Sequence, residues 1–164
     1  MEERKPNFSM NNPSELIYNL LRDQKIAYET IVHDKDQTEE QIMNQFGLTL
    51  QQGAKSMVLN GDDAFHLIVL AGDRRLDLKK AKHELGIKNK IRLATNEEIK
   101  RLMGCEIGSC YPIGAIIGLK TFVDTSLSQN ETIFFNPGVA DKWVKMSWND
   151  YAHLVKPDLI SVSQ

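Results

Sequence analysis

The sequence has few of the residues that mark secreted, metal-binding or membrane proteins. Its 164 residues include two cysteines, Cys105 and Cys110, whose spacing matches neither a CxxC redox motif nor half of a zinc pattern. No apolar run is long enough to cross a membrane, and the mean hydropathy is -0.36. The N-terminal residues are polar and lack the apolar core of a signal peptide. We therefore expect a cytoplasmic protein with reduced cysteines and with no metal, cofactor or membrane partner.

The chain also lacks a strong excess of charge of either sign. Its 20 lysine and arginine residues and 22 acidic residues give a formal net charge of -2 at pH 7. Non-specific affinity for nucleic acid is a sum of phosphate contacts, so this balance argues against a protein that coats DNA or RNA. Between residues 74 and 92, however, eight basic residues face two acidic ones. This segment is either a solvated helix face or a local RNA contact, with Lys79, Lys80 and Lys82 as the candidate contact residues.

The length suits one domain that buries roughly two-thirds of the surface of its unfolded chain. We expect residues 1–11 to form a flexible N-terminal segment and residues 12–164 to form that domain. Helix-capping patterns begin at Asn12, Thr38, Asp77, Thr95 and Ser147. They predict helices over residues 13–24, 39–46, 78–85, 96–103 and 148–155.

Strand patterns are more frequent than helical ones. Alternating or apolar runs predict strands over residues 27–33, 53–59, 65–70, 90–93, 115–123, 132–135, 143–146 and 158–162. We expect the second and third of these to form a hairpin closed by an Asn-Gly-Asp-Asp loop, because Asn-Gly favours the positive φ angles of tight turns. Strands joined mostly by short turns predict an α+β fold with a largely antiparallel or mixed sheet and helices outside it.

A single lysine interrupts the small and apolar strand predicted for residues 53–59. Alternate side chains of a strand share a face, which places Lys55 with Met57 and Leu59 and predicts that it points partly inward. It is either an edge-strand lysine that blunts aggregation and reaches water, or a cation at the mouth of a pocket. In the second case its ammonium group would orient a carbonyl or stabilise negative charge on the carbonyl oxygen.

Two further segments are candidates for the same site. Residues 104–118 are rich in glycine and small residues and show no helical or strand period. Such a loop is either a plain connection or a place where backbone N–H groups approach a ligand. Tyr28 and His33, on the first predicted strand, either point into a site or make hydrogen bonds in a turn or core.

Three features of the sequence, taken in order, resemble a known family. They are Lys55 with the later segment Gly72-Asp73-Arg74-Arg75-Leu76-Asp77-Leu78-Lys79-Lys80, the glycine loop over residues 108–114, and Phe134-Phe135-Asn136-Pro137-Gly138. This order resembles the YbaK-type aminoacyl-tRNA deacylases, free-standing relatives of the editing domain inserted in bacterial prolyl-tRNA synthetases. The resemblance extends from about Ile31 to the C-terminus. It implies a curved, barrel-like sheet with peripheral helices and a site on one side.

The chemistry that the resemblance implies is hydrolysis, in trans, of the ester joining a wrong amino acid to the 3′ end of a tRNA. That reaction needs a cation or amide donors near the ester carbonyl, and a water or the neighbouring ribose hydroxyl for attack. The implied partners are mischarged tRNA and, as an open alternative, a synthetase. Lys55 would be the catalytic residue, and the substrate-binding residues would be Gly108, Ser109, Cys110, Pro112, Gly114, Asn136, Gly138, Tyr28 and His33.

Some positions depart from the family pattern. Family loops usually carry phenylalanine where this chain has Ile113, some members have histidine in place of Asn136, and others have an aspartate near Trp143. Asn136 can donate and accept hydrogen bonds but cannot take a proton at neutral pH, and Trp143 is either a packing residue or a pocket wall. Alanine or cysteine on tRNA(Pro) is the substrate suggested by analogy. The alternative function is a non-catalytic module of the same fold that binds a small amino-acid-like ligand or a partner protein.

Overall fold

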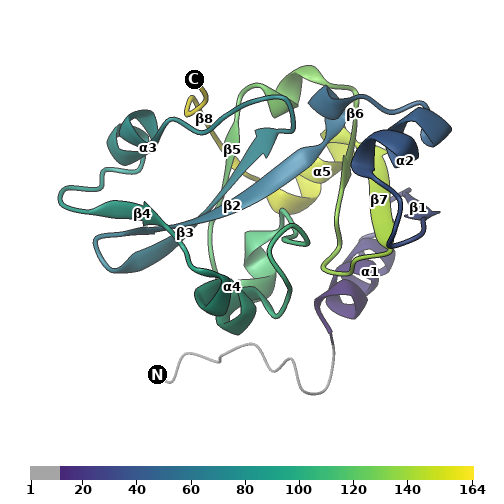
Figure 1. Cartoon of the computed structure of the whole chain (residues 1–164), viewed down its shortest axis with the longest axis horizontal. Helices are drawn as coiled ribbons and strands as arrows, with labels where there is room; N and C mark the ends of the chain where they lie inside the picture. The colour runs from purple at the N-terminus through teal and green to yellow at the C-terminus, as the bar shows by residue number, and fades with distance from the viewer. Residues whose placement is uncertain (1–11) are drawn as a thin grey trace.

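Two β-sheets form the frame of the protein. The structure is a computed structural model that describes residues 12–164, so the predicted flexible segment 1–11 lies outside the described residues. The larger sheet contains β2 (Ala54–Gly61), β3 (Ala64–Ala71), β4 (Ile91–Leu93), β5 (Thr121–Asp124) and β8 (Asp158–Ile160), in the order β4-β2-β3-β5-β8. The smaller sheet contains β1 (Glu29–Val32), β6 (Thr132–Phe135) and β7 (Lys142–Ser147), in the order β1-β7-β6 (Figure 1).

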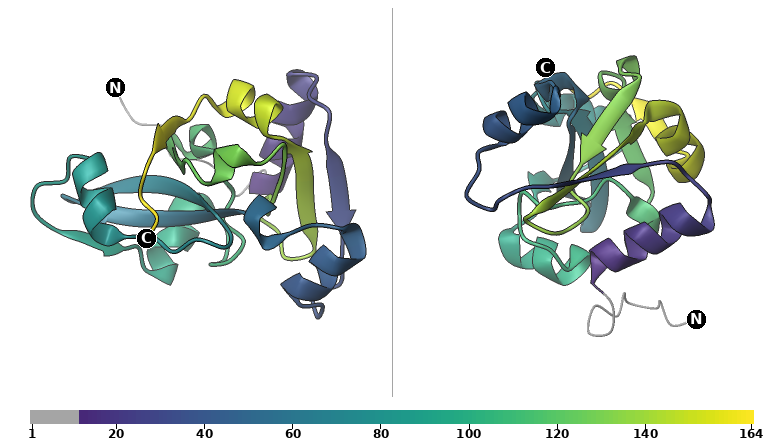
Figure 2. Two further views of the ribbon diagram at one scale, coloured as in Figure 1. Left: turned by 90° about the horizontal axis from the view of Figure 1, so that it is seen from above. Right: turned by 90° about the vertical axis from the view of Figure 1, so that its right-hand side faces the viewer.

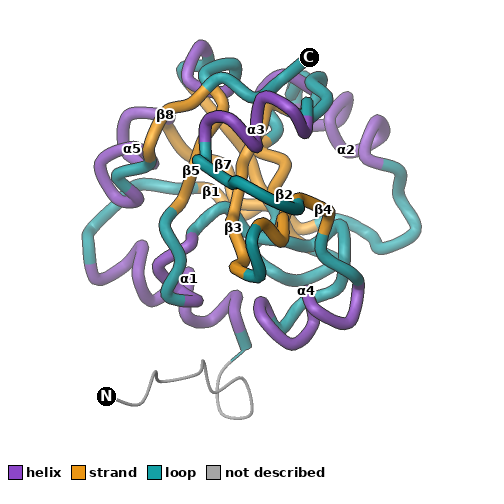
Figure 3. The backbone as a smooth tube through the Cα atoms, turned by 90° about the vertical axis from the view of Figure 1, so that its left-hand side faces the viewer, coloured by secondary structure: helices purple, strands orange, loops and turns teal. Residues whose placement is uncertain are grey.

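Helices lie around the outside of these sheets (Figure 3). They are α1 (Pro13–Asp23), α2 (Glu39–Phe46), α3 (Leu78–Glu84), α4 (Asn96–Met103) and α5 (Trp148–Val155), with short 3-10 helices η1 (Leu50–Gln52), η2 (Gly114–Ile117) and η3 (Leu127–Gln129). The predicted caps are present: the side chain of Asn12 accepts from the backbone N–H of Glu15, and Thr38 and Thr95 each close a capping box. The α+β class with peripheral helices is thus confirmed.

The two sheets remain separate and open. The larger one is mixed, because β3 pairs antiparallel with β2 but parallel with β5, and the smaller one is antiparallel throughout. Strands of the smaller sheet run across one end of the larger sheet, where Gly53 forms an isolated bridge with Phe134 (Figure 2). The described strands therefore form no closed sheet, and the barrel-like shape implied by the resemblance is not confirmed.

The turn of the β2–β3 hairpin lies in the second half of the predicted Asn-Gly-Asp-Asp loop, so the positive φ angles shift from Asn-Gly to Asp-Asp. Asn60 and Gly61 lie within β2, while Asp62 and Asp63 take the positive φ angles of the turn, at 52° and 63°. Two interactions explain the shift. A Cβ on Gly61 would lie 2.2 Å from Cδ1 of Ile87, so this glycine is needed for close packing in the strand. The carboxylate of Asp62 accepts hydrogen bonds from two backbone N–H groups of the chain leading to β4, which stabilises the turn.

A second prediction was wrong over half its length. Residues 115–123 were expected to form one strand, but η2 occupies the first part and β5 begins only at Thr121. Gly118 ends η2 in the left-handed conformation at φ 71°, which an extended strand does not allow. The fold thus keeps the loop between α4 and β5 irregular, and this loop forms one wall of the site described below.

Apolar side chains cover both faces of β2. Val58 belongs to the main core, which lies between the larger sheet and the elements α1, α4 and α5, whereas Leu59 packs into a second cluster with Ala81 of α3 and Ile160 of β8. This double burial explains the near-continuous apolar character of β2 and β3. Within residues 12–164, no helix is both long enough and apolar enough to cross a membrane.

Candidate functional site

A pocket of about 230 Å³ opens where the two sheets meet. Its walls come from the start of β2, the end of β6, β7, α2, η1, the turn after β3 and the glycine loop. Segments that are far apart in the sequence therefore border one cavity. The lining residues are Glu39, Met43, Leu50, Gly53, Ala54, Lys55, Ser56, Gly72, Gly108, Cys110, Phe134, Phe135, Asn136 and Trp143.

Lys55 lies at the rim of this pocket. Its side chain is exposed, and its Nζ donates a hydrogen bond to the backbone carbonyl of Arg74 at 2.6 Å. The expectation that Lys55 points partly inward therefore needs correction, because the apolar cluster that covers its face of β2 begins only at Met57. A lysine ammonium has three donors, so two remain for a ligand beside the one held by Arg74.

The glycine loop contributes only its first part to the pocket. Gly108 and Cys110 line the cavity that Lys55 also lines, whereas Ser109, Pro112 and Gly114 are not among the lining residues. The N–H of Gly114 donates to Oγ1 of Thr121 at 2.8 Å, and a Cβ on Gly114 would lie 2.3 Å from a backbone oxygen. This glycine therefore serves packing. The carbonyl of Pro112 likewise accepts from the hydroxyl of buried Tyr151 at 2.6 Å.

Asn136 lines the pocket from the end of β6. Its Oδ1 accepts from the backbone N–H groups of Gly138, at 2.8 Å, and Val139, at 3.0 Å, so the side-chain NH₂ group is the part that can serve a ligand. Gly138 is not a lining residue; it has φ 97° and sits close to Pro13 and Tyr111. The turn after β6 thus fixes Asn136 by local backbone contacts.

Tyr28 and His33, which flank β1 on either side, lie outside the pocket lining. Tyr28 borders a different hollow, beside Tyr18 of α1. The ring of His33 packs edge-on against Trp143 with centroids 5.2 Å apart, and Trp143 stacks on Phe134 at 4.7 Å. His33 therefore supports the aromatic wall from behind. Its Nδ1 lies 3.1 Å from the carbonyl of Asp34, which can only accept, so Nδ1 carries the proton of this hydrogen bond.

Two of the lining residues that sequence reasoning missed, Ser56 and Glu39, have polar side chains. Ser56 has a buried Oγ with no hydrogen-bond partner among the described residues, although a buried hydroxyl is normally paired. A polar residue between Ala54 and Val58, on the apolar face of the strand, was the signal that could have identified it. Glu39, in the first turn of α2, brings a carboxylate to the pocket; the capping pattern explained it fully and gave no sign of a second role.

The three candidate RNA-contact lysines lie on α3, at the end of the larger sheet away from the smaller sheet and the pocket (Figure 1). Lys80 donates to the carbonyl of Ser163 at 2.8 Å and Lys82 donates to that of Asn89 at 2.7 Å. Both ammonium groups therefore have structural partners as well as exposure. Across residues 12–164, no group of three histidine, cysteine or acidic side chains is placed to hold a metal ion.

Known proteins with the same sequence and fold features identify the class. Residues 33–154 match the aminoacyl-tRNA editing domain family. The multifunctional Ser/Thr-tRNA deacylase ProXp-y of Escherichia coli K12 is 30% identical over 148 residues, covering 87% of each chain. The proline–tRNA ligase of Halalkalibacterium halodurans is 41% identical over 70 residues, which are 43% of this chain and 12% of the ligase.

A solved structure shares the fold as well. The crystal structure of a candidate trans-editing enzyme for prolyl-tRNA synthetase has a TM-score of 0.80 and 21% identity, over 93% of this chain and 97% of that one. The chain therefore belongs to the aminoacyl-tRNA editing domain family. The resemblance to the YbaK-type deacylases is confirmed, and with it the predicted enzyme class, an aminoacyl-tRNA hydrolase acting on the ester bond.

Proposed function

We propose that this protein is a trans-editing deacylase that hydrolyses the ester of tRNA mischarged with a small amino acid, with Lys55 as its catalytic residue. The observation that supports this best is that Lys55, Gly108, Cys110 and Asn136 line one pocket. An ester carbonyl in that pocket would meet a cation from one side and the glycine loop from the other. No other group is required to activate the ester, because it is already reactive and needs mainly positioning and charge stabilisation.

In this mechanism the ammonium of Lys55 stabilises the negative charge that develops on the ester oxygen. A water molecule or the neighbouring ribose hydroxyl attacks the carbonyl carbon. The hydrogen bond to the Arg74 carbonyl holds Nζ at the pocket rim before the substrate arrives, and the remaining two donors are available to the ester. Such preorganised donors are most effective where the substrate excludes water from them.

The size of the pocket favours a small aminoacyl group. A cavity of about 230 Å³ is below the roughly 300–1,000 Å³ typical of pockets for drug-sized ligands. The stacked rings of Phe134 and Trp143 form one wall, and Met43 lies on the same side of the lining from α2. Side chains of the size of alanine, cysteine, serine and threonine fit this space.

Among these, we favour serine and threonine. The unpaired hydroxyl of Ser56 would gain its missing hydrogen bond from a hydroxylated side chain, and burial of an unpaired hydroxyl is costly without one. The similarity to the Ser/Thr-tRNA deacylase of E. coli supports the same choice. Alanine or cysteine on tRNA(Pro) is the second candidate, because the aromatic wall also suits an apolar side chain. A synthetase would be the natural partner, since its mischarged product is the substrate.

The test is deacylation of tRNAs charged with serine, threonine, alanine or cysteine. The wild-type protein should release serine and threonine fastest, and Lys55→Ala should be about 100-fold slower or more on each, with an unchanged melting temperature. Lys120→Ala is the matched control, since Lys120 is an exposed lysine paired with Asp158, outside the pocket. A wild-type rate for Lys55→Ala would overturn the mechanism. Binding of an aminoacyl-adenosine analogue without any turnover would support the non-catalytic alternative.

A further inference from the structure

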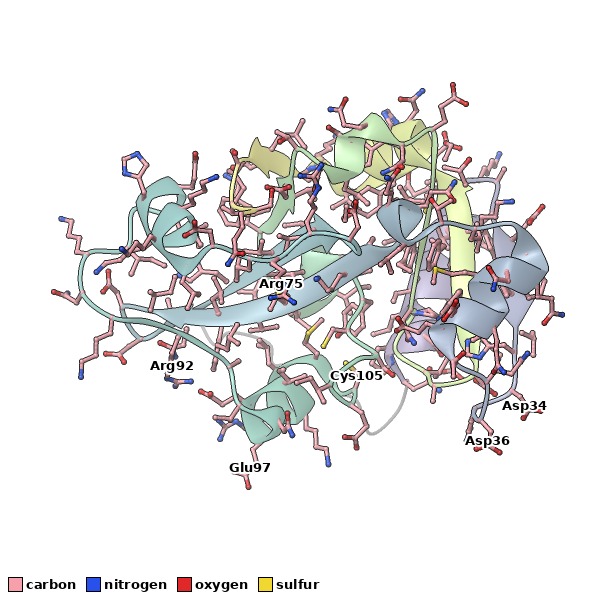
Figure 4. All side chains as sticks on the ribbon, turned by 45° about the horizontal axis from the view of Figure 1, so that its top comes forward. Asp34, Asp36, Arg75, Arg92, Glu97 and Cys105 are labelled. Carbon is pink, nitrogen blue, oxygen red and sulfur yellow. The ribbon has the colours of Figure 1, made fainter. Side chains whose placement is uncertain are left out.

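The two cysteines of the chain face each other beneath the glycine loop. Cys105 and Cys110 are both 7% exposed, and their sulfurs are 4.0 Å apart, with the Cys105 thiol donating to the sulfur of Cys110. Figure 4 labels Cys105, in the loop that follows α4. Cys110 lines the pocket and Cys105 does not. One thiol is therefore open to a small molecule in the pocket, and the other lies directly behind it.

The two chain segments that carry Cys105 and Cys110 are joined by a hydrogen bond. The buried hydroxyl of Tyr111 donates to the carbonyl of Met103 at 2.7 Å, which joins the two chain segments that carry the cysteines. Between them the loop turns with a hydrogen bond from Ser109 to Glu106 at 3.0 Å, and its tip is exposed, with Ile107 60% accessible. The sulfurs would need to approach from 4.0 Å to the bonded distance of about 2.05 Å, and the loop tip between the two cysteines is exposed and not packed in the core.

We propose that Cys105 and Cys110 form a reversible disulfide when a peroxide reaches the pocket, and that this bond slows deacylation by reshaping the pocket wall. The formation of the bond is independent of the proposed function, whereas its effect on turnover rests on it. Disulfide formation would draw the Cys110 sulfur out of the pocket lining and pull on Gly108, which lines the same wall. Displacing a substrate by about 1 Å from its reactive position can cost a large part of the rate.

The hydrogen bond between the thiols assigns their roles. It lowers the pKa of the Cys110 thiol, and it raises the pKa of the Cys105 thiol together with burial. Cys110 lines the pocket and also has the lower pKa, so Cys110 is the thiol that meets the peroxide and Cys105 is the resolving thiol.

The reaction balances with hydrogen peroxide as the oxidant. The Cys110 thiolate attacks one peroxide oxygen; an S–O bond forms, the O–O bond breaks, and hydroxide leaves to give a sulfenic acid. The Cys105 sulfur then attacks the Cys110 sulfur; the S–S bond forms, the S–O bond breaks, and the leaving hydroxide takes the Cys105 proton to form water. Two thiols are oxidised and one peroxide is reduced to two waters. A dithiol reductant reverses the change by thiol–disulfide exchange.

The experiment uses the full chain, first reduced, then freed of reductant and treated with one equivalent of hydrogen peroxide. The intact mass should fall by two hydrogen atoms with no dimer on a non-reducing gel. No lysine or arginine lies between Leu102 and Leu119, so both cysteines fall in one tryptic peptide, and that peptide should carry the loss. Seryl-tRNA deacylation should fall about tenfold and recover fully with dithiothreitol.

Cys105→Ala is the matched variant, because it removes the resolving thiol from a position outside the pocket lining. It should keep the basal rate, and with peroxide its mass should rise by oxygen on Cys110 instead of falling by two hydrogens. A wild-type protein that gains oxygen or forms only dimers would overturn the disulfide, whether or not the variant folds. A disulfide that leaves the rate unchanged would overturn the regulatory role. If the reduced protein hydrolyses no aminoacyl-tRNA, the proposed function fails, while the mass still decides the disulfide.

Discussion

The two ends of strand β2 differ in how completely their polar groups are hydrogen-bonded. At the turn end, the carboxylate of Asp62 accepts from the backbone N–H groups of Lys88 and Asn89 at 2.7 and 2.8 Å, and these bonds lower the pKa of Asp62. Nearby, Arg92 of β4 forms two hydrogen bonds with Glu98, at 2.7 and 3.1 Å. At the pocket end, the Ser56 hydroxyl has no partner among the described residues, and Lys55 uses a single hydrogen bond.

This difference separates groups that hold the fold from groups that can hold a ligand. A polar group that is fully paired stabilises the structure, whereas a buried unpaired one costs free energy and needs a reason to be present. Strand pairing along the edge of β2 also differs between its two ends. Strand β4 pairs with only Leu59–Gly61, so that nearer the pocket this edge of β2 has no strand partner in the larger sheet. The pocket end of β2 therefore has more unpaired polar groups than the turn end.

The largest expected effect comes from changing the shape of the cation without its charge. Lys55→Arg should reduce kcat/KM for seryl-tRNA about 100-fold, because the planar guanidinium is larger and cannot place a compact charge at the same point. The measurement is steady-state deacylation beside a thermal melt, which should not change. Near wild-type activity in Lys55→Arg would mean that charge alone is sufficient and that the position of Nζ beside Arg74 is unimportant.

A smaller and selective effect is expected at the unpaired hydroxyl. Ser56→Ala should lower kcat/KM for seryl-tRNA about fivefold and leave alanyl-tRNA unchanged, since only the hydroxylated side chain loses a hydrogen bond. The variant should also be slightly more stable to urea, because a buried group without a partner has been removed. Ser161→Ala, at an exposed position, is the control for the substitution itself. An equal loss of kcat/KM on both substrates would show that Ser56 maintains the shape of the pocket and makes no hydrogen bond to the side chain of the substrate's amino acid.

A weaker effect is expected from the basic helix α3. Reversing Lys79, Lys80 and Lys82 to glutamate should raise KM for charged tRNA about threefold and flatten its salt dependence, because phosphate contacts are lost. Hydrolysis of a seryl-adenosine ester should not change, since no residue of α3 lines the pocket.

Charge reversal at three other exposed lysines, Lys25, Lys35 and Lys100, changes the net charge equally and serves as the control. If both triple variants raise KM to the same extent, the effect is one of overall charge and α3 makes no specific contact with tRNA.

The smallest effect concerns stability at the turn end of β2. The hydrogen bonds from Arg92 lower the pKa of Glu98 from 4.5 to about 2, so Glu98 contributes stability above pH 4.5 and loses it as the pH falls toward 2. The difference in unfolding free energy between wild type and Glu98→Gln should therefore be present at neutral pH and disappear near pH 2. Urea denaturation at both pH values measures it. Glu97→Gln is the control, on the same turn of α4 (Figure 4); an equal effect there would remove the role of Arg92.

Sequence patterns predicted the local features of this molecule well. The helix starts at Asn12, Thr38 and Thr95 follow from hydrogen bonds within four residues, which a sequence motif encodes completely. The sequence also predicts the hairpin, but the positive φ angles of its turn fall on Asp62 and Asp63 instead of Asn60 and Gly61. The reason is that the packing of Gly61 against Ile87 is a long-range contact, which no dipeptide rule contains.

The sequence predicted some features of the candidate site and missed others. The resemblance pointed to Lys55, Gly108, Cys110 and Asn136, which line one pocket, but their roles remain predictions. The place of His33 behind Trp143 depends on how β1 pairs with β7, and the lack of a partner for the Ser56 hydroxyl depends on which side chains pack over its face of β2. Both are properties of the assembled sheets, and for this reason the strand pattern alone could not supply them.

The way the pocket is assembled also bears on the time at which activity can begin during synthesis. Its walls include Glu39 near the start of the chain and Trp143 near its end, and the single bridge between Gly53 and Phe134 joins the sheets that enclose it. While β6 and β7 have not yet emerged from the ribosome, a nascent chain has only part of the cavity, even if the hairpin that carries Lys55 is already folded. With this pocket as the proposed site, action on an aminoacyl-tRNA therefore requires that the chain has been made at least as far as Trp143.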